Sequence, residues 1–239
     1  MEVLAIGNSF SSDATRYLQD IAGEELYVRN LYIGGCSLER HVMNALCDNV
    51  DYEYQMDAKG MYMTTLKEAL RKHNWDYITL QQKSGHSGVF KSCEPFLGQM
   101  IAYINRYAPK ATIVWFQTWA YEIDSGHGDF GLYEKNQQKM YEKIIETSNQ
   151  IKEKYQLPIL PTGVTIQTLR ETVPEFDYLN GGKSLCRDGF HLTYDYGRYA
   201  AALSWYRFFT KKPVGKMSFA PEGTDMKLIQ KIQSSIDKN

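Results

Sequence analysis

Short apolar runs alternate with longer amphipathic stretches along the 239-residue chain. The apolar runs are rich in β-branched and aromatic residues, as buried strands are, and they lie at residues 3–7, 27–33, 77–81, 111–118 and near 160. Helical periodicity occupies the intervals, at 13–22, 38–47, 64–73, 95–107 and 132–154. Strands that alternate with helices predict a parallel sheet covered by helices on both faces.

A further helix is predicted after the last strand. Its buried face is indicated by the spacing of Tyr196, Tyr199, Ala200 and Leu203, and Thr193 is a candidate N-cap. Residues 49–63 and 122–131 interrupt the alternation, and we expect both to be insertions at the sheet edge. The chain has no internal repeat and no linker, so a single domain over residues 1–239 is predicted.

Composition narrows the classes of partner. The formal net charge is -1 and the basic residues are dispersed, which argues against nucleic acid or an anionic membrane as a partner. No apolar run approaches the roughly 20 residues that span a bilayer. The first predicted strand also begins too early to leave room for a signal peptide, so a cytoplasmic protein is expected. A secreted or periplasmic origin stays open if a leader was removed. The oligomeric state is not determined by the sequence.

Four cysteines occur without a C-x-x-C pair, and they are expected to be reduced and mostly buried thiols: Cys36, Cys47, Cys93 and Cys186. Cys36 is interpreted as a buried small apolar residue and not as a nucleophile. Asp124, His127 and Asp129 lie close together in the sequence but lack the spacing of metal ligands. A solvated glycine-rich loop is the preferred interpretation, and no metal or cofactor is expected.

The candidate chemistry follows the strands. Ligands of open parallel sheets bind beyond the carboxyl ends of the strands. Ser9 of "GNSFS" follows the first strand, Gly35 of "IGGCS" the second, and Gln81 and Gln82 of "LQQKSG" the third.

Near the end of the chain, "RDGFHLT" supplies Asp188 and His191 just before the last long helix of the alternating pattern. A serine hydroxyl needs an imidazole base, and a carboxylate orients that base. Ser9, His191 and Asp188 can therefore form a nucleophile, base and orienter.

These four blocks, in this order and over essentially the whole chain, resemble the SGNH (GDSL-type) hydrolase superfamily. The resemblance implies a flavodoxin-like three-layer α/β/α sandwich with a five-stranded parallel sheet. It also implies ester hydrolysis, often of acetyl groups on carbohydrates. Carried onto this chain, Ser9 is the nucleophile, Asp188 and His191 complete the triad, and the Ser9 and Gly35 backbone N–H groups form part of the oxyanion hole.

The chain departs from the superfamily pattern twice. Asn8 stands where the first block usually has aspartate, which changes a supporting hydrogen-bond acceptor. The third block lacks the usual asparagine that donates to the oxyanion, and a glutamine amide can make the same bond. Gln82 is the preferred candidate, with Gln81 as the alternative.

The expected function is therefore a serine ester hydrolase, a carbohydrate O-acetyl esterase or similar small-ester esterase, whose partner is a small-molecule or oligosaccharide ester. A flavodoxin-like phosphate or flavin binder is an alternative, because a hydroxyl-rich loop before a helix can hold phosphate. A catalytically silent carbohydrate-binding member of the same fold is another. Trp119 is either core packing or a platform for a sugar ring, whereas Trp115 is expected in the core.

Overall fold

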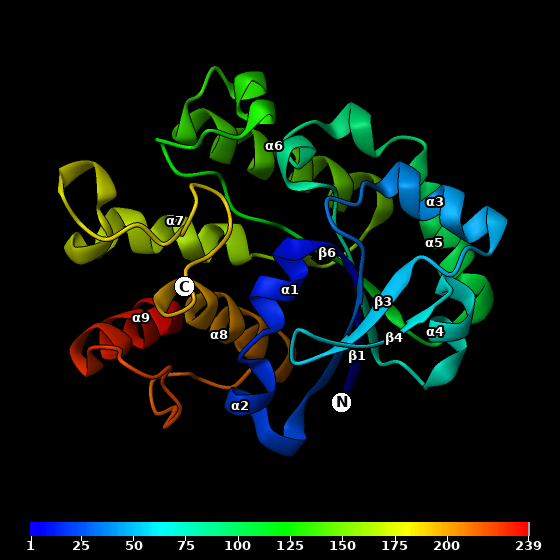
Figure 1. Ribbon diagram of the computed structural model, residues 1–239, viewed down its shortest axis with the longest axis horizontal. Helices are drawn as coiled ribbons and strands as arrows, with labels where there is room; N and C mark the ends of the chain where they lie inside the picture. Colours follow the sequence, from blue (N-terminus) through cyan, green and yellow to red (C-terminus); the bar gives the residue numbers. More distant parts are fainter. Residues whose placement is uncertain (239) are drawn as a thin grey trace.

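A seven-stranded mixed sheet forms the centre of the molecule, with strand order β4-β3-β2-β1-β5-β6-β7. The computed structural model describes residues 1–238. The strands are β1 (Glu2–Gly7), β2 (Tyr27–Tyr32), β3 (Tyr52–Met56), β4 (Lys59–Thr64), β5 (Tyr77–Leu80), β6 (Thr112–Phe116) and β7 (Ile159–Leu160). Figure 1 shows the sheet with helices packed around it.

The sheet is larger than the five-stranded parallel sheet that was expected, and it is mixed. Five strands are parallel, in the order β2-β1-β5-β6-β7, which is the flavodoxin-like order. The two further strands, β3 and β4, are antiparallel to their neighbours and come from residues 52–64, which nearly coincide with the expected edge insertion at 49–63. Asp57 and Ala58 both have positive φ at the turn between them, as a tight hairpin requires. This hairpin extends the edge of the sheet beside β2.

Helices cover both faces of the sheet. The α-helices are α1 (Ser9–Thr15), α2 (Leu18–Ala22), α3 (Leu38–Cys47), α4 (Leu66–Lys72), α5 (Phe96–Tyr107), α6 (Gln137–Tyr155), α7 (Thr162–Thr172), α8 (Tyr196–Thr210) and α9 (Met226–Lys238). Short 3₁₀ turns join them at η1 (Gly23–Glu25), η2 (Ser84–His86), η3 (Phe90–Cys93), η4 (Gly128–Tyr133), η5 (Pro174–Phe176) and η6 (Tyr178–Asn180). The sequence pattern did not indicate α7 or α9. Asp195, not Thr193, is the N-cap of α8, although the Thr193 hydroxyl accepts from Gly197 N.

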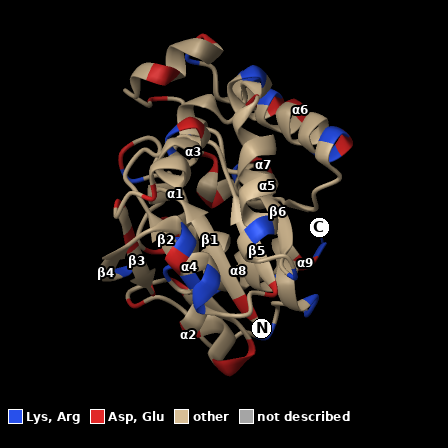
Figure 2. Cartoon of the chain, turned by 90° about the vertical axis from the view of Figure 1, so that its right-hand side faces the viewer, with Lys and Arg blue, Asp and Glu red and all other residues tan. Residues whose placement is uncertain are grey.

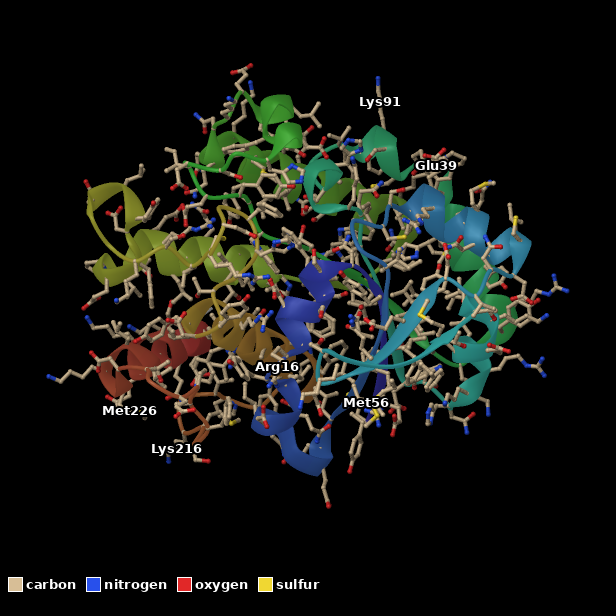
Figure 3. The ribbon with its side chains drawn as sticks, viewed as in Figure 1. Arg16, Glu39, Met56, Lys91, Lys216 and Met226 are labelled. Carbon is tan, nitrogen blue, oxygen red and sulfur yellow. The ribbon has the colours of Figure 1, made fainter. Side chains whose placement is uncertain are left out.

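Two apolar cores lie on opposite faces of the sheet. Along β1, Val3 and Ala5 pack with α1, α2, α7, α8 and α9, whereas Leu4 and Ile6 pack with α3, α4 and α5. This alternation explains why β1 is apolar throughout, because a central parallel strand is buried on both sides. Side chains fill the layers between sheet and helices (Figure 3).

The surface carries both signs of charge. Lys and Arg are interspersed with Asp and Glu along α6 and elsewhere, without one large region of a single sign in the view of Figure 2. Within residues 1–238, no helix combines the length and the apolar character needed to cross a bilayer.

Candidate active site

Ser9 is the first residue of α1, directly after the carboxyl end of β1. Asn8 has extended backbone and caps the helix, because its Oδ1 accepts from Phe10 N at 3.0 Å. β1 lies between β2 and β5 in the sheet, so Ser9 is placed at the point where the strand order reverses. Ligand sites in open α/β sheets form at such a point.

The structure brings Asp188 and His191 to Ser9. His191 Nε2 lies 2.8 Å from Ser9 Oγ, and His191 Nδ1 lies 2.7 Å from Asp188 Oδ2. An ionised carboxylate can only accept, so Nδ1 donates to Asp188 and Nε2 is left to accept the Ser9 proton. The side chain of His191 is 21% exposed, which leaves it reachable by a substrate.

The loop geometry holds Asp188 as a carboxylate. Its Oδ1 accepts from His191 N at 2.7 Å and from Phe190 N at 3.2 Å, so the D-x-x-H turn closes on its own side chain. Partial burial raises the pKa of Asp188, but the hydrogen bonds from the His191 side chain and these two backbone groups outweigh it and lower the pKa overall. Asp188 therefore stays negatively charged and able to orient the imidazole.

The Asn8 side chain both accepts and donates hydrogen bonds, whereas the aspartate usual at this position would only accept them. Its side chain is 1% exposed, Oδ1 also accepts from Gln81 Nε2 at 2.9 Å, and Nδ2 donates to Cys36 O at 3.1 Å. The donated bond ties the loop after β1 to the loop after β2. An aspartate could not donate it, so the asparagine is specific to this arrangement.

Asp13 of α1 anchors the loop that carries the triad. Its carboxylate is 2% exposed and accepts from Arg187 Nη1, from Arg198 Nε at 2.8 Å and from Leu192 N at 2.9 Å. The helix that begins at Ser9 is thereby joined to residues on both sides of His191. The sequence does not mark Asp13 as special, because an acidic residue in a short helix gives no sign of distant basic partners.

Trp119 holds the same loop from the other side and cannot be a sugar platform. Its side chain is 0% exposed, its ring stacks on Phe10 at 4.2 Å between centroids, and its Nε1 donates to Phe190 O at 2.8 Å. The platform alternative is wrong, because both ring faces are enclosed. Trp115 is also buried, at 2% exposed.

The glutamine amides are committed to bonds within the fold. Gln82 Nε2 donates to the backbone and hydroxyl oxygens of Ser92, and Gln82 Oε1 accepts from Leu38 N and Lys83 N. Gln81 Nε2 donates to Asn8. The expectation that Gln82 or Gln81 donates to an oxyanion is therefore not supported, since the Gln81 amide N–H already donates to Asn8 in the loop after β1 and that of Gln82 to Ser92 in η3.

Gly35 lies in an exposed turn beside the Ser9 loop. Cys36 N donates to Ile33 O at 3.2 Å, and Gly35 at the turn has φ +61°, a conformation that favours glycine. β1 and β2 are neighbours in the sheet, which brings this turn next to Ser9. Burial raises the pKa of the Cys36 thiol to about 12, so it remains protonated and unreactive.

The segment after β6 packs against the triad loop. Glu122 N donates to Gly189 O at 2.7 Å, and the His127 and Phe190 rings meet edge to face at 4.9 Å. Asp124 accepts from a tyrosine, Tyr178, while Asp129 pairs with Lys83. These acidic groups therefore have separate partners, and no group of three or more potential ligands able to hold a metal ion is found in residues 1–238.

Comparison with protein families gives one match that spans nearly the whole chain. The model described as "Domain of unknown function (DUF4886)" matches residues 2–236. A crystal structure of a DUF4886 family protein from Bacteroides uniformis is 33% identical, with a TM-score of 0.90, and the match covers 100% of this chain and 93% of that one. No curated protein matches the chain.

More distant structures share the fold. A putative SGNH hydrolase from Slackia heliotrinireducens is 17% identical at a TM-score of 0.55, covering 87% of this chain and 98% of that one. An acetyl xylan esterase is 14% identical at a TM-score of 0.57, covering 86% and 98%. The chain therefore has an SGNH-like fold.

Proposed function

The chain belongs to the DUF4886 family, and we propose that it is a serine ester hydrolase that works through an acyl-enzyme on Ser9. The observation that carries the proposal is the continuous hydrogen-bonded row from Ser9 Oγ through His191 to Asp188, at 2.8 and 2.7 Å. A serine hydroxyl serving only as a helix cap needs no imidazole beside it. In this structure Asn8, not Ser9, makes the capping bond.

In the proposed reaction, Ser9 Oγ attacks the ester carbonyl while its proton passes to His191 Nε2. Asp188 stabilises the imidazolium that forms. Collapse of the tetrahedral intermediate transfers that proton to the departing alcohol and leaves Ser9 acylated. Water then attacks the acyl-enzyme with His191 again as base, which releases the acid and restores the serine.

The oxyanion donors in this proposal are the backbone N–H groups of Ser9 and Gly35. Ser9 occupies the first turn of α1, where backbone N–H groups have no partner within the helix. The exposed turn at Gly35 supplies a second backbone donor from the adjacent loop. No side-chain amide is included, because the amides of Gln81 and Gln82 are otherwise engaged.

We propose a carbohydrate O-acetyl ester, or a similarly small ester, as substrate. An acetyl xylan esterase with the same fold supports this class. The phosphate-binding alternative is weakened by the helix itself. α1 is only seven residues long, and Asn8 already takes its Phe10 N–H.

The test is hydrolysis of p-nitrophenyl acetate and of acetylated xylan fragments by the wild-type chain and Ser9→Ala. Loss of the nucleophile should lower kcat by about 10⁴- to 10⁶-fold without changing the melting temperature. Ser12→Ala is the matched control, since Ser12 is a half-buried serine of the same helix. The proposal fails if Ser9→Ala retains the wild-type rate, or if the wild type hydrolyses no ester in a chain-length series.

A further inference from the structure

A polar cavity of about 430 Å³ lies between α7, the start of α6 and η6. In Figure 1 these elements approach one another on the upper left, where the green segment after β6 runs beside the yellow segment before α8. Gln138 and Asn180 on its lining are exposed, so the cavity opens to solvent. Its volume falls in the range of roughly 300–1,000 Å³ typical of small-molecule sites.

The lining is rich in side-chain carboxamides, and in each of them only one of the two polar atoms is hydrogen-bonded within the protein. One end of every amide bonds within the protein, and no hydrogen bond is found for the other end among the described residues. The atom without a hydrogen bond is the amide nitrogen in Asn136. It is the amide oxygen in the other four residues, Gln137, Gln138, Gln167 and Asn180. The lining therefore offers a ligand mainly hydrogen-bond acceptors, of which the Gln167 oxygen is buried.

Two of the lining side chains are buried and incompletely paired. Gln167 is 5% exposed and its Oε1 has no partner, and the Arg170 side chain is 5% exposed with its Nε unpartnered. They lie three residues apart on α7, so both face the same side of that helix. Buried polar atoms without a partner are costly, and a ligand or water in the cavity is the natural partner for them.

The charge of the lining narrows the ligand further. Glu122, Glu171 and Asp177 contribute three carboxylates against the single guanidinium of Arg170, which disfavours an anionic ligand. A simple ammonium ion could donate to the amide oxygens but could not accept from Asn136 Nδ2 or Arg170 Nε. A hydroxyl group does both.

We propose that this cavity binds the saccharide part of a neutral carbohydrate ester. That the bound saccharide belongs to an ester substrate rests on the proposed esterase function. That the cavity binds a neutral saccharide does not depend on that function. Glu122 joins the cavity to the triad loop, because it lines the cavity while its backbone N–H donates to Gly189 O at 2.7 Å. Ser184 Oγ, from the segment leading to Asp188, also donates to Glu122 at 2.8 Å.

The experiment is calorimetric titration of the intact chain with neutral, ester-free trisaccharides of xylose, glucose, mannose and N-acetylglucosamine. We expect at least one to bind with a millimolar or tighter Kd. Gln167→Leu, which keeps the volume and removes the amide, should weaken that binding about fivefold, as should Asn180→Leu. Gln230→Leu is the matched control, because Gln230 lines a separate cavity between α7 and α9.

Two results would overturn the proposal. The first is that no trisaccharide binds at millimolar concentration, or that only a polyamine such as spermidine does. The second is that a trisaccharide binds with the same affinity to wild type, Gln167→Leu and Asn180→Leu. Melting temperatures show whether each variant is folded. Because the probes carry no ester, loss of esterase activity in Ser9→Ala leaves this titration unaffected, and the two proposals can fail separately.

Discussion

Replacement of Asp13 by asparagine tests whether the buried carboxylate holds the triad loop in place. The substitution keeps the shape of the side chain but turns one oxygen into an N–H donor. That donor would face Arg187 Nη1 and Leu192 N, which now donate to Oδ2 at 3.0 and 2.9 Å. Three donors then meet where an acceptor is needed, and the charge of Arg198 loses its counter-ion as well.

The expected cost follows from the burial of the partners. Removing one member of a fully buried ion pair costs about 3–5 kcal/mol. Asp13 is 2% exposed, but the side chains of Arg187 and Arg198 are 25% and 18% exposed, so water can partly solvate them after the change. We therefore expect the low end, about 3 kcal/mol of unfolding free energy. For a chain of this length that is a fall of roughly 6–12 °C in melting temperature.

Activity should fall through geometry. Loss of the anchor loosens the backbone on both sides of His191, so kcat for p-nitrophenyl acetate should fall about ten- to a hundredfold with little change in KM. The assays are thermal unfolding and steady-state hydrolysis at temperatures where the variant is folded. Asp20→Asn is the control, because Asp20 pairs with Arg16 at 3.7 Å on the exposed surface and should cost less than about 1 kcal/mol. An Asp13→Asn protein with the melting temperature and kcat of the wild type would refute the anchoring role.

Three further substitutions test the remaining parts of the site. Asn8→Asp should cost about 3 kcal/mol near neutral pH, since it buries a carboxylate against Cys36 O; equal melting temperatures of variant and wild type would contradict this. Gln82→Leu should lower the melting temperature but change kcat by no more than severalfold, whereas a hundredfold loss would restore it as an oxyanion donor. Asp188→Asn should lower kcat about 10²- to 10⁴-fold. Because the folded pKa of Asp188 lies below its ordinary 3.8, any stability that the carboxylate contributes is present above that value and lost as pH falls through the folded pKa. The difference in melting temperature between wild type and Asp188→Asn should therefore be small, given the 42% exposure of Asp188, and should vanish in strong acid.

The main elements of the fold could be predicted from local pattern. β1 is apolar on both faces because it lies in the centre of a covered sheet, and α3 and α5 follow helical periodicity closely. α7 was not predicted from the sequence, because it buries threonine, glutamine and arginine side chains, which do not form an apolar stripe. The β3–β4 hairpin was missed as strand because β4 is exposed at five of its six residues and presents no buried face.

The sequence by itself determined which residues carry the candidate chemistry. Ser9 follows a strand and Asp188 and His191 share a short turn, and both features are local. The contacts between distant segments were decided only by the tertiary structure. Asp13 meets Arg187 across 174 residues, and Gln81 is turned toward Asn8 across 73. A side chain's hydrogen-bond partners depend on which loops the sheet order makes neighbours, and no local pattern in the chain records that order.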